Sequence, residues 1–193
     1  MDPLHPSLPG IAVVCRKTLN ISEVNQLIER RAMSLKCGGE IFVNVYAPSG
    51  TANKKERMEM FNELSVYLLE WRDKLPVMAG DWNVILAEID TTRNCQTKFC
   101  KVLDRIVKSF HYHDCFRLLH PTAREFTFHR GDHVAQSRLD RVYIPTHLIA
   151  SLVSARHRPG ISDHCQVEVM MKLSAGQGRP NQHQRKSFWK LNT

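Results

Sequence analysis

The sequence feature that most constrains the fold is an amphipathic helix between two apolar segments. Residues 53–75 carry apolar side chains every three or four positions, which predicts a helix that buries one stripe in a core. The stripe consists of Met58, Phe61, Leu64, Leu68, Trp71 and Leu75. Residues 40–46 and 75–79 are short and apolar and end near Pro48 and Gly80, as buried strands do. Strands that alternate with a helix in this way predict a layered α/β domain.

The other apolar patterns predict that strands dominate the second half of the chain. Further strands are expected at 11–15, 125–128, 138–144 and 165–171, a second helix at 97–110 and one or two helical turns at 146–153. Residues 21–35 fit either a pair of strands or a short helix, and Gly38 and Gly39 predict a tight turn after them. Asn53 and Glu56 have the spacing of a capping box. We therefore expect a sheet with mixed strand pairing.

Length and composition indicate a single globular domain. The 193 residues suit one domain, expected at 10–173, after an irregular segment 1–9 and before a basic linker and tail at 174–193. No stretch approaches the ~20 apolar residues of a membrane span, and the N-terminus lacks the regions of a signal peptide. We therefore expect no membrane partner and an intracellular, not secreted, protein. Six cysteines without zinc spacing predict free, mostly buried thiols in a reducing compartment.

The net charge of +8 is concentrated in two regions of the chain. Residues 172–193 hold five basic residues and no acid, and residues 120–160 hold six arginines against three acids. Clustered positive charge suits a polyanion such as nucleic acid, but many basic domains only have solvated charged faces. Charge alone leaves both interpretations open.

Polar side chains follow three of the predicted strands, where sites in α/β domains usually form. Asp81 and Asn83 come after one strand and are two residues apart, so both can point the same way. Asp140 lies inside an otherwise apolar strand, and Asp163 and His164 precede the last strand. A carboxylate beside an imidazole can hold a divalent metal and position a general base. Each feature alone fits a turn or a salt bridge, but their common place at strand ends favours a site.

Five motifs in this order resemble the endonuclease/exonuclease/phosphatase superfamily, which includes exonuclease III, the apurinic endonucleases and pancreatic deoxyribonuclease. They are Val45-Tyr46-Ala47-Pro48, Gly80-Asp81-Trp82-Asn83, Phe126-Thr127-Phe128, Ser137-Arg138-Leu139-Asp140-Arg141 and Ser162-Asp163-His164. The resemblance covers about residues 10–171 and is strongest to the endonuclease domain of non-LTR (long interspersed) retrotransposons. Residues 187–193 look like the segment that joins that endonuclease to its reverse transcriptase, which would then be a partner in the parent polyprotein.

The resemblance implies a four-layer α/β sandwich of the DNase I-like type, with two packed mixed sheets flanked by helices. It also implies hydrolysis of DNA phosphodiester bonds with Mg²⁺ or Mn²⁺. In that reaction Asp81 would orient or deprotonate the attacking water, and Asn83 would hold this water and a phosphate oxygen. Tyr46 would contact the scissile phosphate. His164 would act on the phosphate or as a base, with its ring fixed by a hydrogen bond to Asp140.

The resemblance further implies one metal ligand and a DNA-binding surface. Asp163 would contribute to the metal site, because Mg²⁺ prefers hard oxygen ligands. The DNA-contacting or supporting residues would be Arg124, Arg130, Arg138, Arg141, Thr127 and Ser162. The arginines would contact phosphates, which positions DNA without reading its sequence. Alternatively, Arg138 and Arg141 pair with Asp140 or with neighbouring acids.

The chain departs from the family pattern at its beginning. Family members open with a strand that carries an Asn and a second that carries a metal-binding Glu after a Gln, and no acid before Tyr46 lies in such a motif. We therefore expect a domain without these opening strands, from a shortened copy or a partial gene sequence, and weakened binding of Mg²⁺. The alternatives to an active nuclease are an inactive nucleic-acid-binding fragment, a phosphatase of small phosphorylated molecules and an unfolded remnant. An enzyme that acts on DNA would be expected in the nucleus.

Overall fold

A computed structural model describes residues 10–93, 100–129, 131, 135–172 and 187–190 of the chain. Within them, the largest sheet has six strands in the order β1-β2-β3-β4-β8-β5. These strands are β1 (Ile21–Ile28), β2 (Ala32–Cys37), β3 (Glu40–Tyr46), β4 (Val77–Asp81), β5 (Tyr112–Asp114) and β8 (Asp140–Pro145). Strands β3 and β4 run parallel, and the other neighbours in this sheet run antiparallel. A parallel pair needs a crossover, which α1 (Lys54–Glu70) provides.

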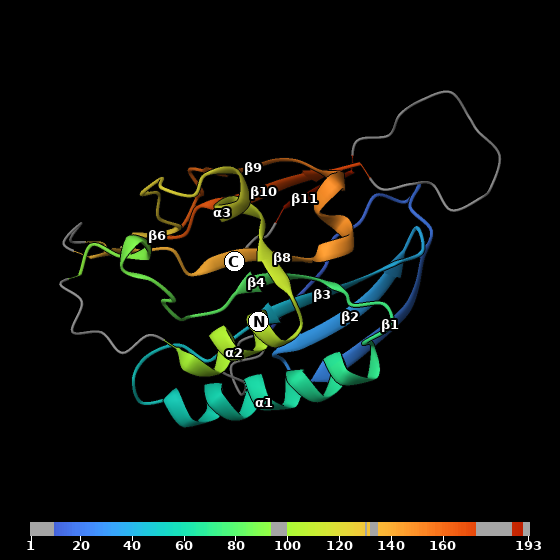
Figure 1. Ribbon diagram of the computed structural model, residues 1–193, viewed down its shortest axis with the longest axis horizontal. Helices are drawn as coiled ribbons and strands as arrows, with labels where there is room; N and C mark the ends of the chain where they lie inside the picture. The colour runs from blue at the N-terminus through green and yellow to red at the C-terminus, as the bar shows by residue number, and fades with distance from the viewer. Residues whose placement is uncertain (1–9, 94–99, 130, 132–134, 173–186, 191–193) are drawn as a thin grey trace, which may run out of the picture.

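A second, antiparallel sheet lies against one face of the first, and two helices lie against the other face (Figure 1). The second sheet has the order β11-β10-β9, and the helices on the far side are α1 and α2. The remaining elements are α2 (Lys101–Ser109), α3 (Cys115–Leu119), η1 (Glu88–Asp90), η2 (Thr146–Ser151), β6 (Phe128–His129), β7 (Gln136–Ser137), β9 (Leu152–Arg158), β10 (Gln166–Met171) and β11 (Ser187–Lys190). The predicted α/β sandwich is therefore confirmed, with the mixed pairing confined to the larger sheet.

Two hydrophobic clusters fill the spaces on either side of the larger sheet. The cluster between this sheet and the helices includes Leu64 and Leu68 from the predicted stripe of α1. The cluster between the two sheets joins Val142 of β8 to Val169 of β10. Consecutive residues of a strand point to opposite faces, so Tyr143 of β8 belongs to the helix-side cluster while its neighbour Val142 faces the second sheet.

Several local predictions agree with the structure. The strand at 40–46 is β3, and residues 21–35 form a pair of strands rather than a helix. Gly38 and Gly39 make the predicted turn with φ values of 59° and 85°, which glycine adopts without strain. The helical turns expected near 146–153 are η2.

The first helix differs from its prediction at both ends. The expected capping box is wrong, because the Asn53 side-chain amide donates to the Ser49 carbonyl oxygen (2.9 Å). The helix ends at Glu70 instead of continuing to residue 75, and residues 71–74 form a turn. The residue before Pro76 is sterically disfavoured in the α conformation, which explains an end ahead of the proline.

Two other predictions were also wrong. Residues 11–15 do not form a buried strand, and Val14 is 93% exposed. The segment is held by the packing of Val13 against a hydrophobic cluster and by a hydrogen bond from the Asn44 side chain to the Ala12 carbonyl oxygen (3.1 Å). An apolar segment forms a strand only where its backbone can pair with the edge of a sheet. The predicted tail at 174–193 includes β11, which pairs with β10, while 173–186 lie outside the described residues.

The sequence patterns did not predict β5, α3 or β9. Strand β9 has the burial pattern of an edge with only one buried residue, and β5 and α3 are too short for a periodic signal. Helix α3 is instead specified by its cap, since the Asp114 carboxylate accepts hydrogen bonds from the backbone N–H groups of Phe116 and Arg117.

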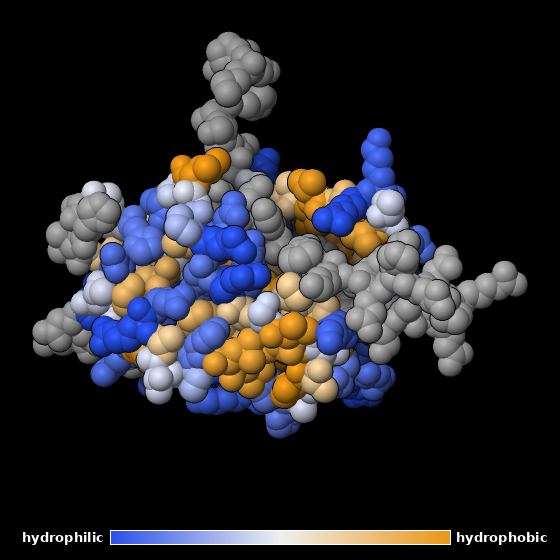
Figure 2. Space-filling view, turned by 90° about the horizontal axis from the view of Figure 1, so that it is seen from above, coloured by the Kyte–Doolittle hydropathy of each residue, from blue (hydrophilic) through white to orange (hydrophobic). Residues whose placement is uncertain are grey.

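The cysteines agree in part with their prediction. The five described cysteines are free thiols, but only Cys100 and Cys115 are buried, and Cys15, Cys37 and Cys165 are partly exposed. On the face seen from above, hydrophobic residues form separate patches between hydrophilic ones (Figure 2). In the described residues, no helix combines the length and the apolar character that crossing a bilayer requires.

Candidate active site

The end of β4 is shaped by a glycine that no other residue can replace easily. Gly80 has a φ of 153°, and a Cβ atom there would lie 1.8 Å from the Val45 carbonyl oxygen of the neighbouring strand. This close approach brings β4 against β3 just before Asp81. The next turn is held by Asn83 in the left-handed region (φ 49°), where asparagine is tolerated better than most residues.

Asp81 and Asn83 are bound to each other and to the chain beside them. Asn83 donates from its backbone N–H to one Asp81 carboxylate oxygen (2.9 Å) and from Nδ2 to the other (2.8 Å). The same Nδ2 donates to the Ala47 carbonyl oxygen (2.8 Å). The turn after β4 is therefore locked against the segment that follows β3 and Tyr46.

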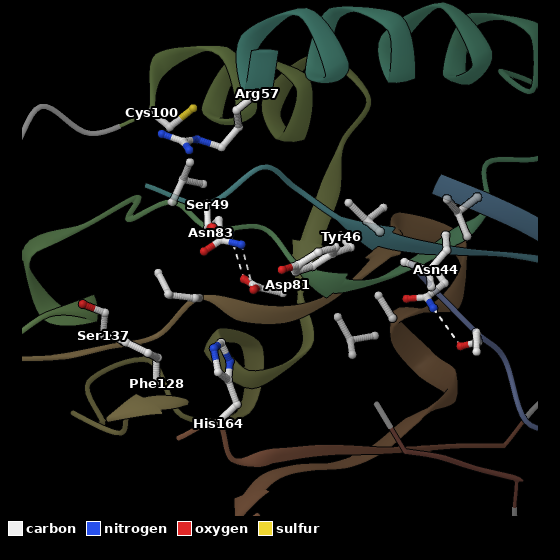
Figure 3. Close-up of a pocket in the computed structure, with 18 of the residues that line it drawn as sticks. Asn44, Tyr46, Ser49, Arg57, Asp81, Asn83, Cys100, Phe128, Ser137 and His164 are labelled. Atoms are coloured by element: carbon white, nitrogen blue, oxygen red, sulfur yellow. Dashed lines mark hydrogen bonds between the residues drawn. The ribbon is translucent and has the colours of Figure 1, made fainter. Parts of the chain in front are cut away.

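Asp140 and His164 complete an acidic cluster, defined here as Asp81, Asp140 and His164. Asp140 is the first residue of β8 and lies directly opposite Asp81 in the antiparallel pairing. His164 Nδ1 is 2.9 Å from Asp140 Oδ2, while Oδ1 of Asp140 is buried without a hydrogen-bond partner among the described residues. One potential ligand atom from each residue lies within 4.8 Å of the others. Figure 3 shows Asp81 and His164 facing the same pocket, with the Tyr46 hydroxyl turned towards Asp81.

Thr127 supports this cluster from inside the protein. Its side chain is fully buried, and its hydroxyl oxygen accepts hydrogen bonds from the backbone N–H groups of Leu139 and Asp140 (both 3.0 Å). Its carbonyl oxygen accepts from the Cys165 N–H (2.6 Å). Thr127 therefore connects the strand that carries Asp140 to the loop that carries His164. Of its two predicted roles, support of the site fits this position and direct contact with DNA does not.

The loop before β10 presents His164 to the pocket. The Ser162 hydroxyl accepts a hydrogen bond from the His164 backbone N–H (3.1 Å), and the Phe128 ring lies 5.1 Å from the His164 ring, centre to centre. Asp163 is exposed and lines the same pocket, but its carboxylate is not among the ligand atoms grouped with Asp81. Its carbonyl oxygen accepts from the His129 N–H (2.8 Å), so the structure gives Asp163 a role in holding the loop.

The acidic cluster concentrates negative charge in a buried place. Burial, followed by the charge of Asp140, raises the pKa of Asp81 to about 7. Burial alone would lower the pKa of His164, but the hydrogen bond and the charge of Asp140 outweigh it and raise that pKa. Both shifts show that this site accepts positive charge readily.

Two predicted DNA-contacting arginines are buried, and their assignment to a DNA surface was wrong. Arg138 and Arg141 are 2% and 1% exposed. Arg138 binds both oxygens of Asp90 and also Asp114, and Arg141 binds Asp90. The alternative of an ion pair is the one found, but the partners are Asp90 and Asp114 instead of Asp140. We call Asp90, Asp114, Arg117, Arg138 and Arg141 the arginine cluster.

The other predicted binding residues have mixed positions. Arg124 is exposed and donates to the Thr91 carbonyl oxygen (3.2 Å). Ser162 is exposed at the rim of the pocket. Arg130 lies outside the described residues.

Basic residues that the sequence analysis did not select line the same pocket as the acidic cluster. The pocket has a volume of about 2040 Å³, and its lining includes the exposed residues Lys54, Arg93 and Lys101. Lys54 and Lys101 are the first residues of α1 and α2. A positive charge at a helix N-terminus opposes the helix dipole, so Lys54, one residue after the predicted start of the first helix, was an available signal. Lys101 lies inside the second helix as predicted from residue 97, and only the structure places it at the helix start.

The family model described as the Endonuclease/Exonuclease/phosphatase family matches residues 5–164. This chain belongs to that family. Membership places it, at the level of the family, among hydrolases of the nuclease and phosphatase type, as the motifs predicted.

Relatives of this family member are found in a transposon and among solved structures. The uncharacterized 149 kDa protein of transposon TX1 from Xenopus laevis is 34% identical over 139 residues, which are 68% of this chain and 10% of that protein. The chain thus spans about a tenth of the length of this curated relative.

The structural neighbours share the fold at low identity. An AP endonuclease from Archaeoglobus fulgidus has a TM-score of 0.68 and 18% identity, with 80% of this chain and 72% of that chain covered. A 3′ phosphatase from Neisseria bound to product DNA hairpin has a TM-score of 0.66 and 17% identity, with 81% and 71% covered. These likenesses confirm the DNase I-like sandwich.

Enzymes of the Endonuclease/Exonuclease/phosphatase family generally use a divalent metal, and the acidic cluster fits such an ion. Oxygen ligands suit Mg²⁺ and Mn²⁺. The buried Oδ1 of Asp140 has no partner in the described part of the chain, and the pKa of Asp81 is raised by burial and then by the charge of Asp140, which a cation would offset. His164 Nδ1 is bonded to Asp140, which leaves Nε2 as its possible ligand atom, and the hard Mg²⁺ ion prefers the oxygens of the two carboxylates.

Proposed function

We propose that this protein hydrolyses phosphodiester bonds of DNA with Mg²⁺ or Mn²⁺, as an endonuclease or an exodeoxyribonuclease of its family. The observation that carries the proposal is the acidic cluster: two buried carboxylates opposite each other in adjacent strands, with an imidazole hydrogen-bonded to one of them. A divalent ion held by Asp140 and Asp81 would neutralise charge on the phosphate in the transition state. Asp163, at the rim, remains a proposed further ligand.

The residues of the site suit the proton transfers of hydrolysis. Asp81 takes a proton from the attacking water, and Asn83 holds this water in place. The water oxygen bonds to phosphorus while the bond to the leaving oxygen breaks, and protonated His164 donates its proton to the phosphate or to the leaving oxygen. The raised pKa of His164 favours the protonated imidazole that donates, and a cation held beside Asp81 would favour the deprotonated carboxylate that accepts the proton. Tyr46 contacts the scissile phosphate.

The pocket supports DNA over a small phosphorylated substrate. Lys54, Arg93 and Lys101 line the pocket together with Asp81 and His164, so they are placed to contact phosphates beyond the scissile one. The transposon relative supports a longer parent protein. In that parent protein we propose a reverse transcriptase as the partner, and the nucleus as the place of action.

Nicking of supercoiled plasmid with Mg²⁺ tests the proposal. The wild-type chain should nick the plasmid, EDTA should stop it, and Asp81→Ala should remove the activity. Asp104→Asn is the control, because Asp104 is an acid on α2 that pairs with Lys108 and does not line the pocket. Equal and negligible cleavage by the wild type and by Asp81→Ala, with both folded, would contradict the proposal.

A second candidate is DNA binding without catalysis. It is favoured by the small ligand set, since the candidate metal group among the described residues contains only two carboxylates and one histidine. This function predicts salt-dependent DNA binding that survives Asp163→Ala and Asp81→Ala. Cleavage of small phosphate esters in preference to DNA would favour a phosphatase instead.

A further inference from the structure

The arginine cluster lies directly behind the acidic cluster and is connected to it by one side chain. Arg141 follows Asp140 in β8, and the two side chains point to opposite faces of the strand. The Arg141 guanidinium is fully buried, and one nitrogen, Nη2, lies 3.3 Å from an Asp90 oxygen. The other terminal nitrogen, Nη1, donates to the carbonyl oxygens of Val84 (2.9 Å) and Leu139 (3.3 Å).

These two carbonyl groups belong to the residues next to the proposed catalytic side chains. Val84 follows Asn83, and Leu139 precedes Asp140. Two further bonds cross the same gap, from the Trp82 backbone N–H to the Leu139 carbonyl oxygen (3.1 Å) and from the Trp82 indole to the Arg141 carbonyl oxygen (3.2 Å). One buried cation therefore holds the turn after β4 and the start of β8 at a fixed separation.

Asp90 makes this arrangement rigid. It is 1% exposed and accepts hydrogen bonds from Arg117, Arg138 and Arg141, so the Arg141 side chain cannot rotate without leaving a buried carboxylate short of a partner. Asp90 reaches Arg141 from η1, an element that contributes no residue to the acidic cluster.

We infer that Arg141 is a positioning residue for the proposed active site, which fixes Asn83 relative to Asp140 by clamping the Val84 and Leu139 carbonyl groups. This inference rests on the proposed function. Arg141 need not contact the substrate, because it acts through the backbone on both sides of the site. A displacement of about 1 Å in a reacting group can cost on the order of 100-fold in rate, so loss of the clamp should affect turnover more than substrate binding.

The molecule contains a matched control for this role. Arg117 has the same bonding pattern: Nη2 donates to Asp90 (2.6 Å), and Nη1 donates to two backbone carbonyl groups, those of His120 and Ala123. Those carbonyl groups lie after α3, away from the residues of the acidic cluster. Replacing either arginine removes one charge and one Asp90 partner, but only Arg141 touches the backbone of the site.

The experiment compares Arg141→Met with Arg117→Met in steady-state DNA nicking below the melting temperature of each variant. Arg141→Met should lower kcat about 10- to 100-fold with KM within about twofold of wild type. Arg117→Met should change kcat less than about threefold, even where its melting temperature falls as far. Arg141→Lys keeps the charge and a donor and should recover part of kcat. Equal kcat losses in both Met variants, or none in either, would overturn the inference.

A measurement without activity separates this inference from the proposed function. Hydrogen exchange of the Trp82 backbone amide, followed by NMR, should accelerate at least about tenfold in Arg141→Met and stay near the wild-type rate in Arg117→Met. If Arg141→Met does not fold, Arg141→Lys and Arg117→Lys give the same comparison with smaller effects. A wild type that exchanges as expected but does not cut DNA would refute the nuclease and leave the clamp standing. Equal Trp82 exchange in the matched variants would refute the clamp whatever the activity.

Discussion

The acidic cluster and the arginine cluster are both built on buried aspartates, yet they are electrostatic opposites. Asp90 is 1% exposed and Asp81 4% exposed, so burial is similar. Burial would raise the pKa of Asp90, but Arg141 and Arg138 outweigh it and lower that pKa to about 2. Asp81 has no ion pair with a lysine or arginine within the described part of the chain, and its pKa rises to about 7. The charge of Asp90 is paired with arginines, which marks the arginine cluster as structural. The charge of Asp81 has no such partner in the described residues, which marks the acidic cluster as a place for a ligand.

Two histidines, His164 in the acidic cluster and His157 beside the arginine cluster, show the same electrostatic contrast. His164 bonds to Asp140 and has a raised pKa. His157 is buried beside the arginine cluster, stacked on the Phe116 ring at 4.2 Å. Burial, followed by the charge of Arg138, lowers its pKa to about 4. The pKa values of the two histidines therefore shift in opposite directions, as the charges around each ring require.

The largest expected effect is on catalysis. Asp140→Asn keeps the shape of the side chain but removes the charge that the proposed metal and His164 require. The rate of plasmid nicking should fall about 10³-fold, within the range for loss of a positioned acid–base system. Asp104→Asn should nick like the wild type. If Asp140→Asn kept more than a tenth of the wild-type nicking rate, the proposed catalytic role that sets the acidic cluster apart from the arginine cluster would be wrong.

The next effect is on stability and concerns the arginine cluster. Asp90→Asn leaves buried arginines without their shared carboxylate, and the free energy of unfolding at pH 7 should fall by about 3 kcal/mol. Urea denaturation followed by circular dichroism measures it. The exposed pair of Asp104 and Lys108 offers the control, since Asp104→Asn should change stability by about 0.5 kcal/mol or less. A loss of that small size for Asp90→Asn would show that the network is not structural.

A smaller effect separates the clusters by pH. Because the pKa of Asp81 is higher in the folded than in the unfolded protein, Asp81 favours folding at low pH, and this contribution is lost as the pH rises through about 7. Relative to wild type, Asp81→Asn should therefore gain about 3 kcal/mol in unfolding free energy between pH 5 and pH 9. For Asp90, with a lowered pKa, the contribution is present above pH 4 and disappears as the pH falls towards 2. A difference between Asp81→Asn and wild type that does not change with pH would contradict the raised pKa.

The smallest expected effect is a difference between the pKa values of two histidines in the wild-type protein. Titration of the histidine ring protons by NMR should place the pKa of His164 above 6.5 and that of His157 near 4. The sign follows from the surroundings, because a second positive charge is favoured beside Asp140 and opposed beside Arg138 and Arg117. His164→Gln and His157→Gln assign the signals. Similar pKa values for the two rings would remove the electrostatic distinction.

Much of the site was predictable because its residues belong to short local motifs at the ends of strands. Asp81 and Asn83 follow a glycine that only a close strand pair requires, and Asp140 stands out in an apolar strand. Their convergence follows from the adjacency of β4 and β8. Arg138 and Arg141 were misassigned because their partners, Asp90 and Asp114, lie 24 to 51 residues away in the chain, at positions without any motif.

The sequence by itself determined the α/β class, the family motifs and the residues that meet at the ends of β4 and β8, because these depend on local patterns of apolar and polar residues. Only the tertiary structure decided which charges face the pocket and which are neutralised inside. The physical reason is that burial costs a charge its hydration, so an arginine next to an aspartate of the acidic cluster pairs with whichever buried carboxylate the fold brings within reach. That choice depends on contacts distant in sequence, and it separates Asp140 from its neighbour Arg141.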